Sequence, residues 1–202
     1  MQGGGIRARG GLAGWSTREV VVAAVVAAIL GLVYMAYSLL WVALSPLLYP
    51  VWVMILYGFY FTAGILVPYI IRKPGAAVIG ETLAAIVEVL AGSPFGVAAI
   101  LAGFLQGLGA EIGFAIGGWR RYNLAIMGLA GLLAALFAYG HDYVLFGYSQ
   151  MPVDVQGGML AMMIISGIVL GGWLSKGIGD ALAATGVLAS FAIGRDRART
   201  AD

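Results

Sequence analysis

The sequence predicts an all-α polytopic membrane protein with six transmembrane helices and both termini in the cytoplasm. Of its 202 residues, 62% are hydrophobic and 10% are charged, whereas ordinary soluble domains carry about 25% charged residues. Six apolar runs reach the roughly 17–25 residues that cross a bilayer as a helix. All 11 lysines and arginines fall on one side of the membrane if these six runs cross it. These three observations exclude a soluble globular domain.

The predicted helices are separated by residues that interrupt a helix. They span residues 19–41, 51–71, 76–92, 95–117, 123–146 and 157–176. Proline cannot continue a helix and glycine relaxes the backbone. One or both occur in every break: Ser45-Pro46 with Pro50, Arg72-Lys73-Pro74-Gly75, Gly92-Ser93-Pro94, Gly118 to Tyr122, and Gly147 to Gln156. The third run is the shortest and contains two glutamates. We therefore expect short turns that connect six helices of unequal length.

The basic residues decide how these helices are oriented. The loops at residues 42–50, 93–94 and 147–156 contain no Lys or Arg. Every basic residue lies in the tails or in the alternate connections: Arg7, Arg9, Arg18, Arg72, Lys73, Arg120, Arg121, Lys176, Arg195, Arg197 and Arg199. Because cytoplasmic loops are enriched in Lys and Arg, both ends are predicted to lie inside. The expected location is the inner membrane of a bacterial or archaeal cell, crossed several times.

Two polar tails flank the predicted membrane domain of residues 18–194. Residues 1–17 are rich in Gly and Arg and too polar to fold alone, so they are predicted to form a disordered cytoplasmic tail. Residues 195–202 are predicted to form a second cytoplasmic tail. Residues 178–194 are nearly long enough to cross, but a crossing would carry three arginines outside. We expect this segment to extend the sixth helix or to lie along the inner face as an interfacial helix.

Motifs for catalysis and for cofactors are nearly absent. The chain has no G-x-x-x-x-G-K-[ST] loop, so any ATP hydrolysis is expected in separate subunits. With one His and no Cys, neither a metal centre nor a Cys–His nucleophile is expected. We therefore predict no enzymatic activity, no metal and no cofactor.

Acidic residues within the predicted helices point to a binding function. Glu81, Glu88, Glu111 and Asp142 lie within apolar runs, and no Lys or Arg lies deep within a run. A charged side chain at the bilayer centre costs about 3 kcal/mol on insertion scales. Such acids tend to face a cavity, a substrate or a polar partner. For any one of them the alternative is a protonated acid held between helices, or an acid near a helix end that reaches a basic residue.

The predicted depth of these acids ranks them. Glu88 lies toward the outside, at the level of His141 and Asp142, so Glu88 and Asp142 are the first candidates for substrate contact. Glu81 lies seven residues, or about 10 Å, deeper on the same helix face, at the level expected for Glu111. These two deeper acids have the alternative of pairing with basic residues of the inner loops, Arg72, Lys73 or Arg120. The predicted substrate-binding residues are Glu88, Gln106, Asp142, His141, Tyr139, Trp52, Glu111 and Glu81.

Aromatic residues gather at the same outer level. They lie around the first outer loop and on both sides of the His141-Asp142 pair: Trp41, Tyr49, Trp52, Tyr139, Tyr143 and Tyr148. For most of them an interfacial aromatic belt is the simpler role. Carboxylates beside aromatic faces, with Gln106 expected near mid-membrane, also suit a flat heteroaromatic ligand, especially a cationic one.

Small residues recur at four-residue spacing, which lets helices approach closely. The glycines of the fourth and sixth helices are predicted to serve internal packing: Gly103, Gly107, Gly109, Gly113, Gly117, Gly167 and Gly171. On the first helix, Ala23 with Ala27, or Ala24 with Ala28, forms a smooth stripe. That stripe suits either internal packing or the docking of another membrane subunit.

Two strings carry a resemblance to a known family. Arg72-Lys73-Pro74-Gly75-Ala76-Ala77 followed by Gly80-Glu81, and Gln106-Gly107-Leu108-Gly109-Ala110-Glu111, are similar to the YkoE family. Members of that family are S components of energy-coupling-factor (ECF) transporters, associated with thiamine and its hydroxymethylpyrimidine precursor. The resemblance extends over residues 15–194 and implies the same six-helix plan.

The resemblance also implies partners. S components bind a vitamin from outside and then associate with a transmembrane coupling subunit and two cytoplasmic ABC ATPases. Their first helix typically carries an Ala-x3-Ala docking motif, which Ala23/Ala27 or Ala24/Ala28 would match here. Their pocket usually lies in the outer half of the membrane, as expected for Glu88 and Asp142. The leading hypothesis is therefore an S subunit that captures thiamine or hydroxymethylpyrimidine.

Two other functions remain open at this stage. A stand-alone transporter coupled to protons or cations would relay protons through Glu81, Glu88 and Glu111. A non-transporting membrane scaffold would use only the Gly and Ala stripes and would bind no ligand.

Overall fold

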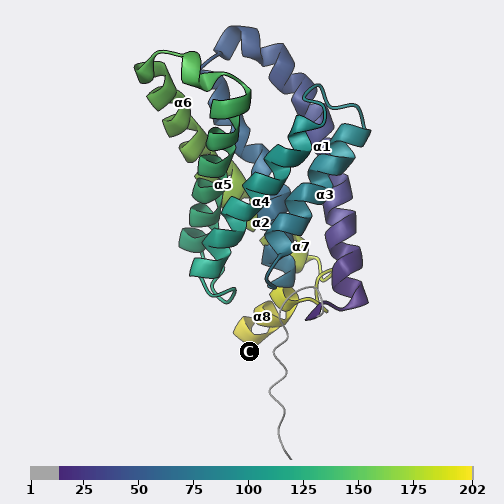
Figure 1. The fold of residues 1–202 in the computed structure, drawn as a ribbon. Helices are drawn as coiled ribbons and strands as arrows, with labels where there is room; N and C mark the ends of the chain where they lie inside the picture. The colour runs from purple at the N-terminus through teal and green to yellow at the C-terminus, as the bar shows by residue number, and fades with distance from the viewer. Residues whose placement is uncertain (1–13, 202) are drawn as a thin grey trace, which may run out of the picture.

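The computed structural model describes residues 14–201 and the side chains of residues 14–196, and every regular element within them is helical (Figure 1). In chain order the elements are α1 (Thr17–Leu48), the 3₁₀ helix η2 (Trp52–Phe61), α2 (Thr62–Ile71), α3 (Ala76–Leu90), α4 (Ala98–Ile116), α5 (Leu124–Leu145), the short 3₁₀ turn η3 (Tyr148–Gln150), α6 (Val153–Ser166), the π-helical η4 (Gly167–Leu174), α7 (Ser175–Ala184) and α8 (Ala192–Ala201). The predicted all-α class is confirmed.

Segments long and apolar enough to cross a membrane occur five times in the described part of the chain: Thr17–Leu48, Trp52–Ile71, Ala98–Ile116, Leu124–Leu145 and Val153–Ala184. They correspond to all the predicted helices except the third. That third helix is α3, with 15 residues, which cover about 22 Å of a hydrocarbon core about 30 Å thick. The chain is therefore a multi-pass membrane protein, and the crossing by α3 stays a prediction.

The first helix is longer than predicted. α1 begins in a capping box, in which the Ser16 hydroxyl accepts from the Glu19 N–H and the Glu19 carboxylate accepts from the Ser16 N–H. The predicted end is residue 41, but α1 continues through Pro46 to Leu48. Pro46 has no backbone N–H to donate to a carbonyl one turn earlier in the helix. The neighbouring Ser45 hydroxyl, however, donates to the Trp41 carbonyl at 2.7 Å. Hydroxyl side chains support membrane helices at prolines in this way, so the proline does not end the helix.

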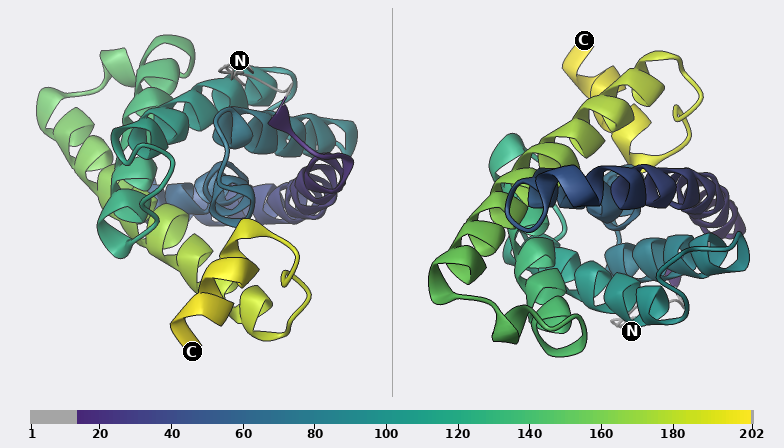
Figure 2. Two further views of the ribbon diagram at one scale, coloured as in Figure 1. Left: turned by 90° about the horizontal axis from the view of Figure 1, so that it is seen from below. Right: turned by 90° about the horizontal axis from the view of Figure 1, so that it is seen from above.

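The second span joins two helix types and forms the centre of the bundle. Every residue of α2 is buried, and the views along the bundle in Figure 2 show the other helices around it. Before it, η2 is a 3₁₀ helix of 10 residues, although such helices seldom exceed about four residues. Because a 3₁₀ helix has about three residues per turn, side chains three apart share a face. Tyr57 and Tyr60 therefore lie on the same side of η2, and both are buried.

Glycines bring α4 close to both of its neighbours. A Cβ added at Gly103 or Gly107 would lie 2.6 Å or 2.9 Å from atoms of α3. A Cβ added at Gly109 or Gly113 would lie 2.5 Å or 2.6 Å from backbone atoms of α5. The internal packing predicted for these glycines is confirmed.

The sixth span is one continuous helical segment from Val153 to Ala184, made of α6, η4 and α7. The sequence predicts that the sixth span ends at residue 176 and that the following segment extends it. In the structure α7 forms this extension as far as Ala184. The chain then turns, and α8 packs against α2 and α7 at the lower end of Figure 1, where Arg72 forms an ion pair with Asp196. Residues 1–13 lie outside the described residues, so the disordered N-terminal tail stays a prediction.

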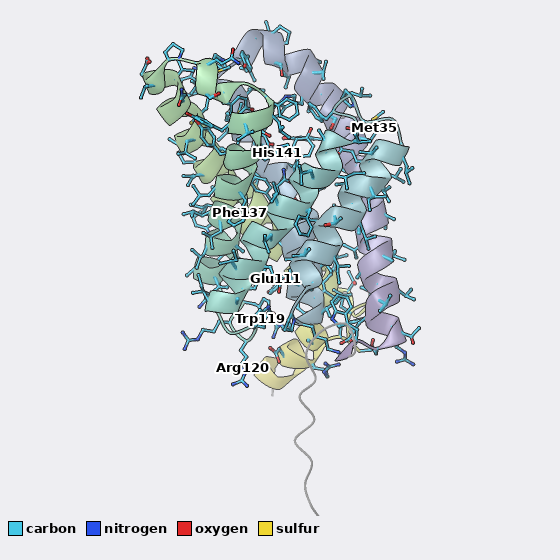
Figure 3. The ribbon with its side chains drawn as sticks, viewed as in Figure 1. Met35, Glu111, Trp119, Arg120, Phe137 and His141 are labelled. Carbon is cyan, nitrogen blue, oxygen red and sulfur yellow. The ribbon has the colours of Figure 1, made fainter. Side chains whose placement is uncertain are left out.

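The two ends of the bundle differ in their connections and charge. The start of α1, the turn at residues 72–75, the turn at residues 117–123 and α8 lie at the lower end of Figure 1, whereas the α1–η2, α3–α4 and α5–α6 connections lie at the upper end. In the described chain, Lys and Arg occur at or near the lower end: Arg18, Arg72, Lys73, Arg120, Arg121, Lys176, Arg195, Arg197 and Arg199. Figure 3 labels Arg120 there.

Candidate ligand-binding cavity

A cavity of about 270 Å³ lies among the parts of α1, η2, α3, α4 and α5 that approach the upper end of the bundle. Five of the eight residues predicted to bind substrate line it: Glu81, Glu88, Gln106, His141 and Asp142. They come from α3, α4 and α5, so the fold brings together acids that are up to 61 positions apart in the chain (81 to 142).

Glu88 is held at the upper level of the cavity by hydroxyl groups. Its Oε1 accepts from Ser38 of α1 at 2.7 Å and from Ser93 at 2.8 Å. The Tyr60 hydroxyl lies 2.9 Å from Ser38 and donates to it, because the Ser38 proton is used on Glu88. Its other oxygen, Oε2, accepts no bond from a described residue. The carboxylate is therefore fixed through one oxygen and leaves the second for a ligand.

Glu81 is held deeper, by the backbone of α2. Its Oε2 accepts from the Gly64 N–H at 2.5 Å and from the Tyr34 hydroxyl at 3.4 Å. Tyr34 in turn accepts from the Ala63 N–H at 2.7 Å. As with Glu88, the remaining oxygen has no partner among the described residues. Both α3 carboxylates are thus positioned by a hydroxyl of α1, and each keeps one free acceptor.

Gln106 lies beside Glu81 on the α4 wall. Its chain neighbour Gly107 packs against Glu81 so closely that a Cβ added there would lie 3.1 Å from the Glu81 Cβ. The Gln106 side chain is buried, lines the cavity and bonds to no other residue of the described chain. An amide offers both a donor and an acceptor. A carboxylate of α3 and an amide of α4 therefore both line the cavity.

Asp142 lies opposite, on α5, and is fully engaged. Its Oδ2 accepts from Tyr57 of η2 at 2.7 Å and from Tyr148 at 3.3 Å, and its Oδ1 lies 2.7 Å from His141 Nδ1. Because both oxygens are used, Asp142 positions its neighbours. His141 is among the lining residues, but its side chain is almost fully buried and its Nε2 has no hydrogen-bond partner in the described chain.

The cavity has two unlike apolar walls. One consists of small residues of α3 and α4: Ala85, Ala98, Ala99, Ala102 and Gly103. The other is aromatic, with Trp41, Tyr57, Tyr60 and Phe95 in successive edge contacts at ring-centre distances of 5.5–6.4 Å. A lining that combines aromatic rings with small residues suits a flat ring system.

The cavity is negative in composition. Three carboxylates, those of Glu81, Glu88 and Asp142, are among its lining residues, which include no Lys or Arg. The described residues contain no group of three or more His, Cys, Asp or Glu side chains arranged to hold a metal ion.

Three of the predicted binding residues lie away from the cavity. Trp52 is 65% exposed, and the Tyr139 hydroxyl donates to the Gln156 carbonyl at 3.1 Å, which ties α5 to α6. Glu111 lies near the lower end with Trp119, far from His141 at the upper end (Figure 3). The structure does not bring these three residues together with the other five.

Glu111 instead joins two connections at the lower end. Its carboxylate accepts from the Gly75 N–H at 2.8 Å, the Ala77 N–H at 2.9 Å and Trp119 Nε1 at 2.7 Å. It therefore caps the start of α3 and holds the α4–α5 turn. The predicted alternative, a pairing of Glu111 with inner-loop cations, is not what forms, because Lys73 bonds to Glu19 at 2.6 Å.

Sequence reasoning missed four residues that shape the cavity: Tyr34, Ser38, Tyr57 and Tyr60. For α1 a signal was present, since Tyr34, Ser38, Trp41 and Ser45 recur at spacings of four, three and four, which place them on one helix face. For η2 the signal was weaker, because Tyr57 and Tyr60 are a single pair three residues apart within a run that is apolar on every side.

Comparisons with known proteins agree with this architecture. A family model described as the permease component of an ABC-type cobalt transport system matches residues 18–137. A Bacillus subtilis (strain 168) protein with the provisional name HMP/thiamine permease protein YkoE is 35% identical over 182 residues, which are 90% of this chain and 92% of the relative. A crystal structure described as an S-component of an ECF transporter matches with a TM-score of 0.90 at 34% identity, over 92% of this chain and 94% of that one. The chain therefore belongs to the permease-component family that this model describes and to the YkoE family of ECF-transporter S components.

Proposed function

We propose that this S component captures hydroxymethylpyrimidine or thiamine from outside the cell and delivers it to an ATP-driven transport complex. The observation that carries the proposal is the cavity, whose lining combines carboxylates and an amide with aromatic and small residues. The relative named for HMP and thiamine supports the same ligand class.

The cavity chemistry suits both rings of such ligands. An aminopyrimidine carries an exocyclic amino donor beside a ring-nitrogen acceptor, which the free oxygen of Glu81 and the amide of Gln106 match in two-point fashion. A thiazolium is a cation, favoured by Glu88 and by the faces of Tyr60 and Trp41. The volume of about 270 Å³ lies just below the roughly 300–1,000 Å³ of pockets for drug-sized ligands. A small vitamin or its precursor is the appropriate size.

The proposed topology places the cavity on the outer side. In our proposal α3 also crosses the membrane, within a locally thinned region, which makes six spans and puts both termini in the cytoplasm of a bacterial or archaeal cell. The basic lower end of the bundle then faces inward, as the positive-inside rule requires. The upper connections, which contain no Lys or Arg, face outward and admit the ligand.

For partners we propose an ECF coupling subunit and two ABC ATPases, with Ala24 and Ala28 as the docking stripe. The alternative pair, Ala23 and Ala27, is buried against other helices of the bundle, because these residues are 1% and 0% exposed. Those two residues begin the buried stripe of α1 that continues to Tyr34 and Ser38. Ala24 is exposed and Ala28 half-buried, so their stripe is available to a neighbouring helix.

Two measurements test the function. Calorimetric titration of the purified chain with hydroxymethylpyrimidine and with thiamine is expected to show saturable binding of at least one. Uptake into liposomes is expected only when the coupling subunit and ATPases are present with ATP. Uptake by the chain alone, driven by an ion gradient, would establish the secondary-transporter alternative instead. Failure of both ligands to bind would overturn the proposal.

A matched pair of acid-to-amide changes separates the binding acid from the structural one. Glu88→Gln keeps an oxygen for the Ser38 and Ser93 hydroxyls but removes the charge, so ligand affinity is expected to fall by about 10- to 100-fold with little change in melting temperature. Glu111→Gln keeps one acceptor oxygen but replaces the other with an NH2 group that faces an N–H donor, so stability is expected to fall by about 1–3 kcal/mol with unchanged affinity. Calorimetry and thermal unfolding of both variants check this. The reverse assignment of effects would contradict the placement of the two acids.

A further inference from the structure

A groove of about 360 Å³ lies between the start of α1 and the segment that joins α7 to α8. Its lining residues come from these two elements: Thr17, Arg18, Val21, Val22, Ser190 and Phe191. None of them lines the ligand-binding cavity. Both elements lie at the lower end of Figure 1, which in the proposed topology meets the cytoplasmic leaflet of the membrane. The groove is therefore a separate candidate site, at the level of the inner lipid head groups.

The apolar part of the groove continues onto a face of α1 that the bundle leaves uncovered. Val21 and Val22 line the groove, and Val21 is exposed together with Val20 and Val25 on the same helix. Among the five long spans, α1 has the smallest share of buried residues in its apolar window, 22%. In a membrane, exposed apolar residues of a spanning helix contact lipid acyl chains. An occupant of the groove can therefore extend an acyl chain along α1.

Arg18 gives the groove a positive charge. It lines the groove and is exposed, and it forms no ion pair with another described residue. The adjacent acid, Glu19, is engaged elsewhere, because its carboxylate bonds to Lys73 at 2.6 Å and to the Ser16 N–H at 2.7 Å. The lining residues include no Asp or Glu. The groove therefore favours an anionic group.

A second arginine is held beside the groove by the chain segment on its other side. Arg195 donates to the Ser190 carbonyl at 2.5 Å, which places an exposed guanidinium next to a lining residue. The neighbouring Asp196 forms an ion pair with Arg72 of the α2–α3 turn. Guanidinium groups bind phosphate oxygens through two parallel hydrogen bonds. Two arginines beside an apolar groove therefore match a phosphate group that carries an acyl chain.

We propose that the groove binds an anionic phospholipid of the cytoplasmic leaflet, with its phosphate toward Arg18 and Arg195 and an acyl chain along Val21 and Val22. Anionic lipids give that leaflet its negative surface potential. A zwitterionic lipid brings a cation to the same place, which the arginines repel. A partner helix packed here would bury Arg18 without a counter-charge, which is costly. This lipid site depends on the proposed orientation of the bundle and not on the transported ligand, so it goes beyond the proposed function.

Native mass spectrometry of the purified full chain tests the site with two lipids of identical acyl chains, phosphatidylglycerol and phosphatidylcholine. Wild type is expected to retain one phosphatidylglycerol about tenfold more tightly, because one arginine near a membrane surface contributes a factor of about five. Arg18→Gln is expected to lower the affinity for phosphatidylglycerol about fivefold and to change that for phosphatidylcholine by less than about twofold. Arg121→Gln is the matched control, since Arg121 is also exposed at the lower end but does not line the groove.

A second pair of variants tests the part of the groove that would hold the acyl chain. Val21→Trp keeps both arginines and fills the groove with an indole ring, so the affinity for phosphatidylglycerol is expected to fall about fivefold or more. Val25→Trp adds the same ring one turn farther along α1, outside the lining residues, and is expected to leave this affinity within about twofold of wild type. Calorimetric titration of hydroxymethylpyrimidine or thiamine is expected to be unchanged in these variants, because the substituted residues do not line the cavity.

Each contrary result would overturn the lipid site in a different way. Equal affinity of wild type for the two lipids would remove the role of charge, and equal losses in Arg18→Gln and Arg121→Gln would show a general effect of surface charge. Unchanged lipid binding in Val21→Trp would place the lipid elsewhere. Inorganic phosphate that binds as tightly as the lipid and displaces it would make this a site for free phosphate.

Two further results separate this site from the other proposals. If Arg18→Gln loses co-purification with the coupling subunit while its lipid binding is unchanged, the groove belongs to that partner and the lipid site is wrong. If hydroxymethylpyrimidine and thiamine both fail to bind while phosphatidylglycerol binds as expected, the proposed function fails and the lipid site stands.

Discussion

Replacing Ala24 by Trp is expected to abolish ATP-driven uptake while leaving ligand binding intact. Ala24 is exposed on α1, beside the buried stripe of Ala23 and Ala27. Helices in membranes associate through close contact of small residues, and an indole ring at this point would hold a partner helix away. Because the side chain points out of the bundle, the cavity and fold are unaffected.

The control for this change lies on the same helix. Leu40 is 46% exposed, near the other end of α1, so Leu40→Trp adds a similar ring outside the docking stripe. Uptake is measured in liposomes with the full complex, assembly by co-purification, and ligand binding by calorimetry. Normal uptake by Ala24→Trp would show that Ala24 and Ala28 do not form the docking surface. Loss of uptake in both variants would show a general effect of bulk on α1.

Gly131→Ala is expected to cause the largest loss of stability from a single added methyl group. The Cα of Gly131 packs on the carbonyl of Gly167, and a Cβ added there would overlap that backbone and lie 3.1 Å from the Gly172 nitrogen. Backbone atoms cannot turn away as a flexible side chain can. Overpacking of this kind costs about 1–3 kcal/mol and occasionally more. The α5–η4 contact is expected to separate, with a lower melting temperature in detergent.

Gly140→Ala is the matched control, because Gly140 lies on the same helix with no atom within 4 Å of an added Cβ. Alanine favours a helix over glycine by about 1 kcal/mol, so this variant is expected to melt at or above the wild-type temperature. Equal melting of the two variants would contradict the close approach of α5 and η4.

Much of the membrane architecture follows from the sequence because the bilayer imposes simple rules. For the five long spans, most of the ends predicted from hydropathy lie within a few residues of the ends in the structure. The exceptions have local causes. Pro46 does not end α1, since Ser45 supports the turn, and the sixth span continues to Ala184. Whether a run of apolar residues is α-helical, 3₁₀ or π-helical depends on packing, and composition does not reveal it.

The candidate site was predictable in its acids and in Gln106 and His141, but not in the hydroxyl groups that hold the acids. The cost of a carboxylate in lipid directed attention to Glu81, Glu88 and Asp142, which line the cavity. The same reasoning wrongly placed Glu111 in the site, because two of the three donors that satisfy it are backbone groups 34 and 36 residues away. Such donors carry no residue signature. The two strings that carry the family resemblance meet at this point, since Glu111 of one bonds to Gly75 and Ala77 of the other.

A structure of the purified protein saturated with hydroxymethylpyrimidine or thiamine is the most direct test of the central claim. The account predicts the flat ring between the small residues of α4 and the aromatic wall of η2, with its amino edge toward Glu81 and Gln106. Ligand density at another position, with Glu88, Gln106 and His141 unchanged in their contacts, would contradict it.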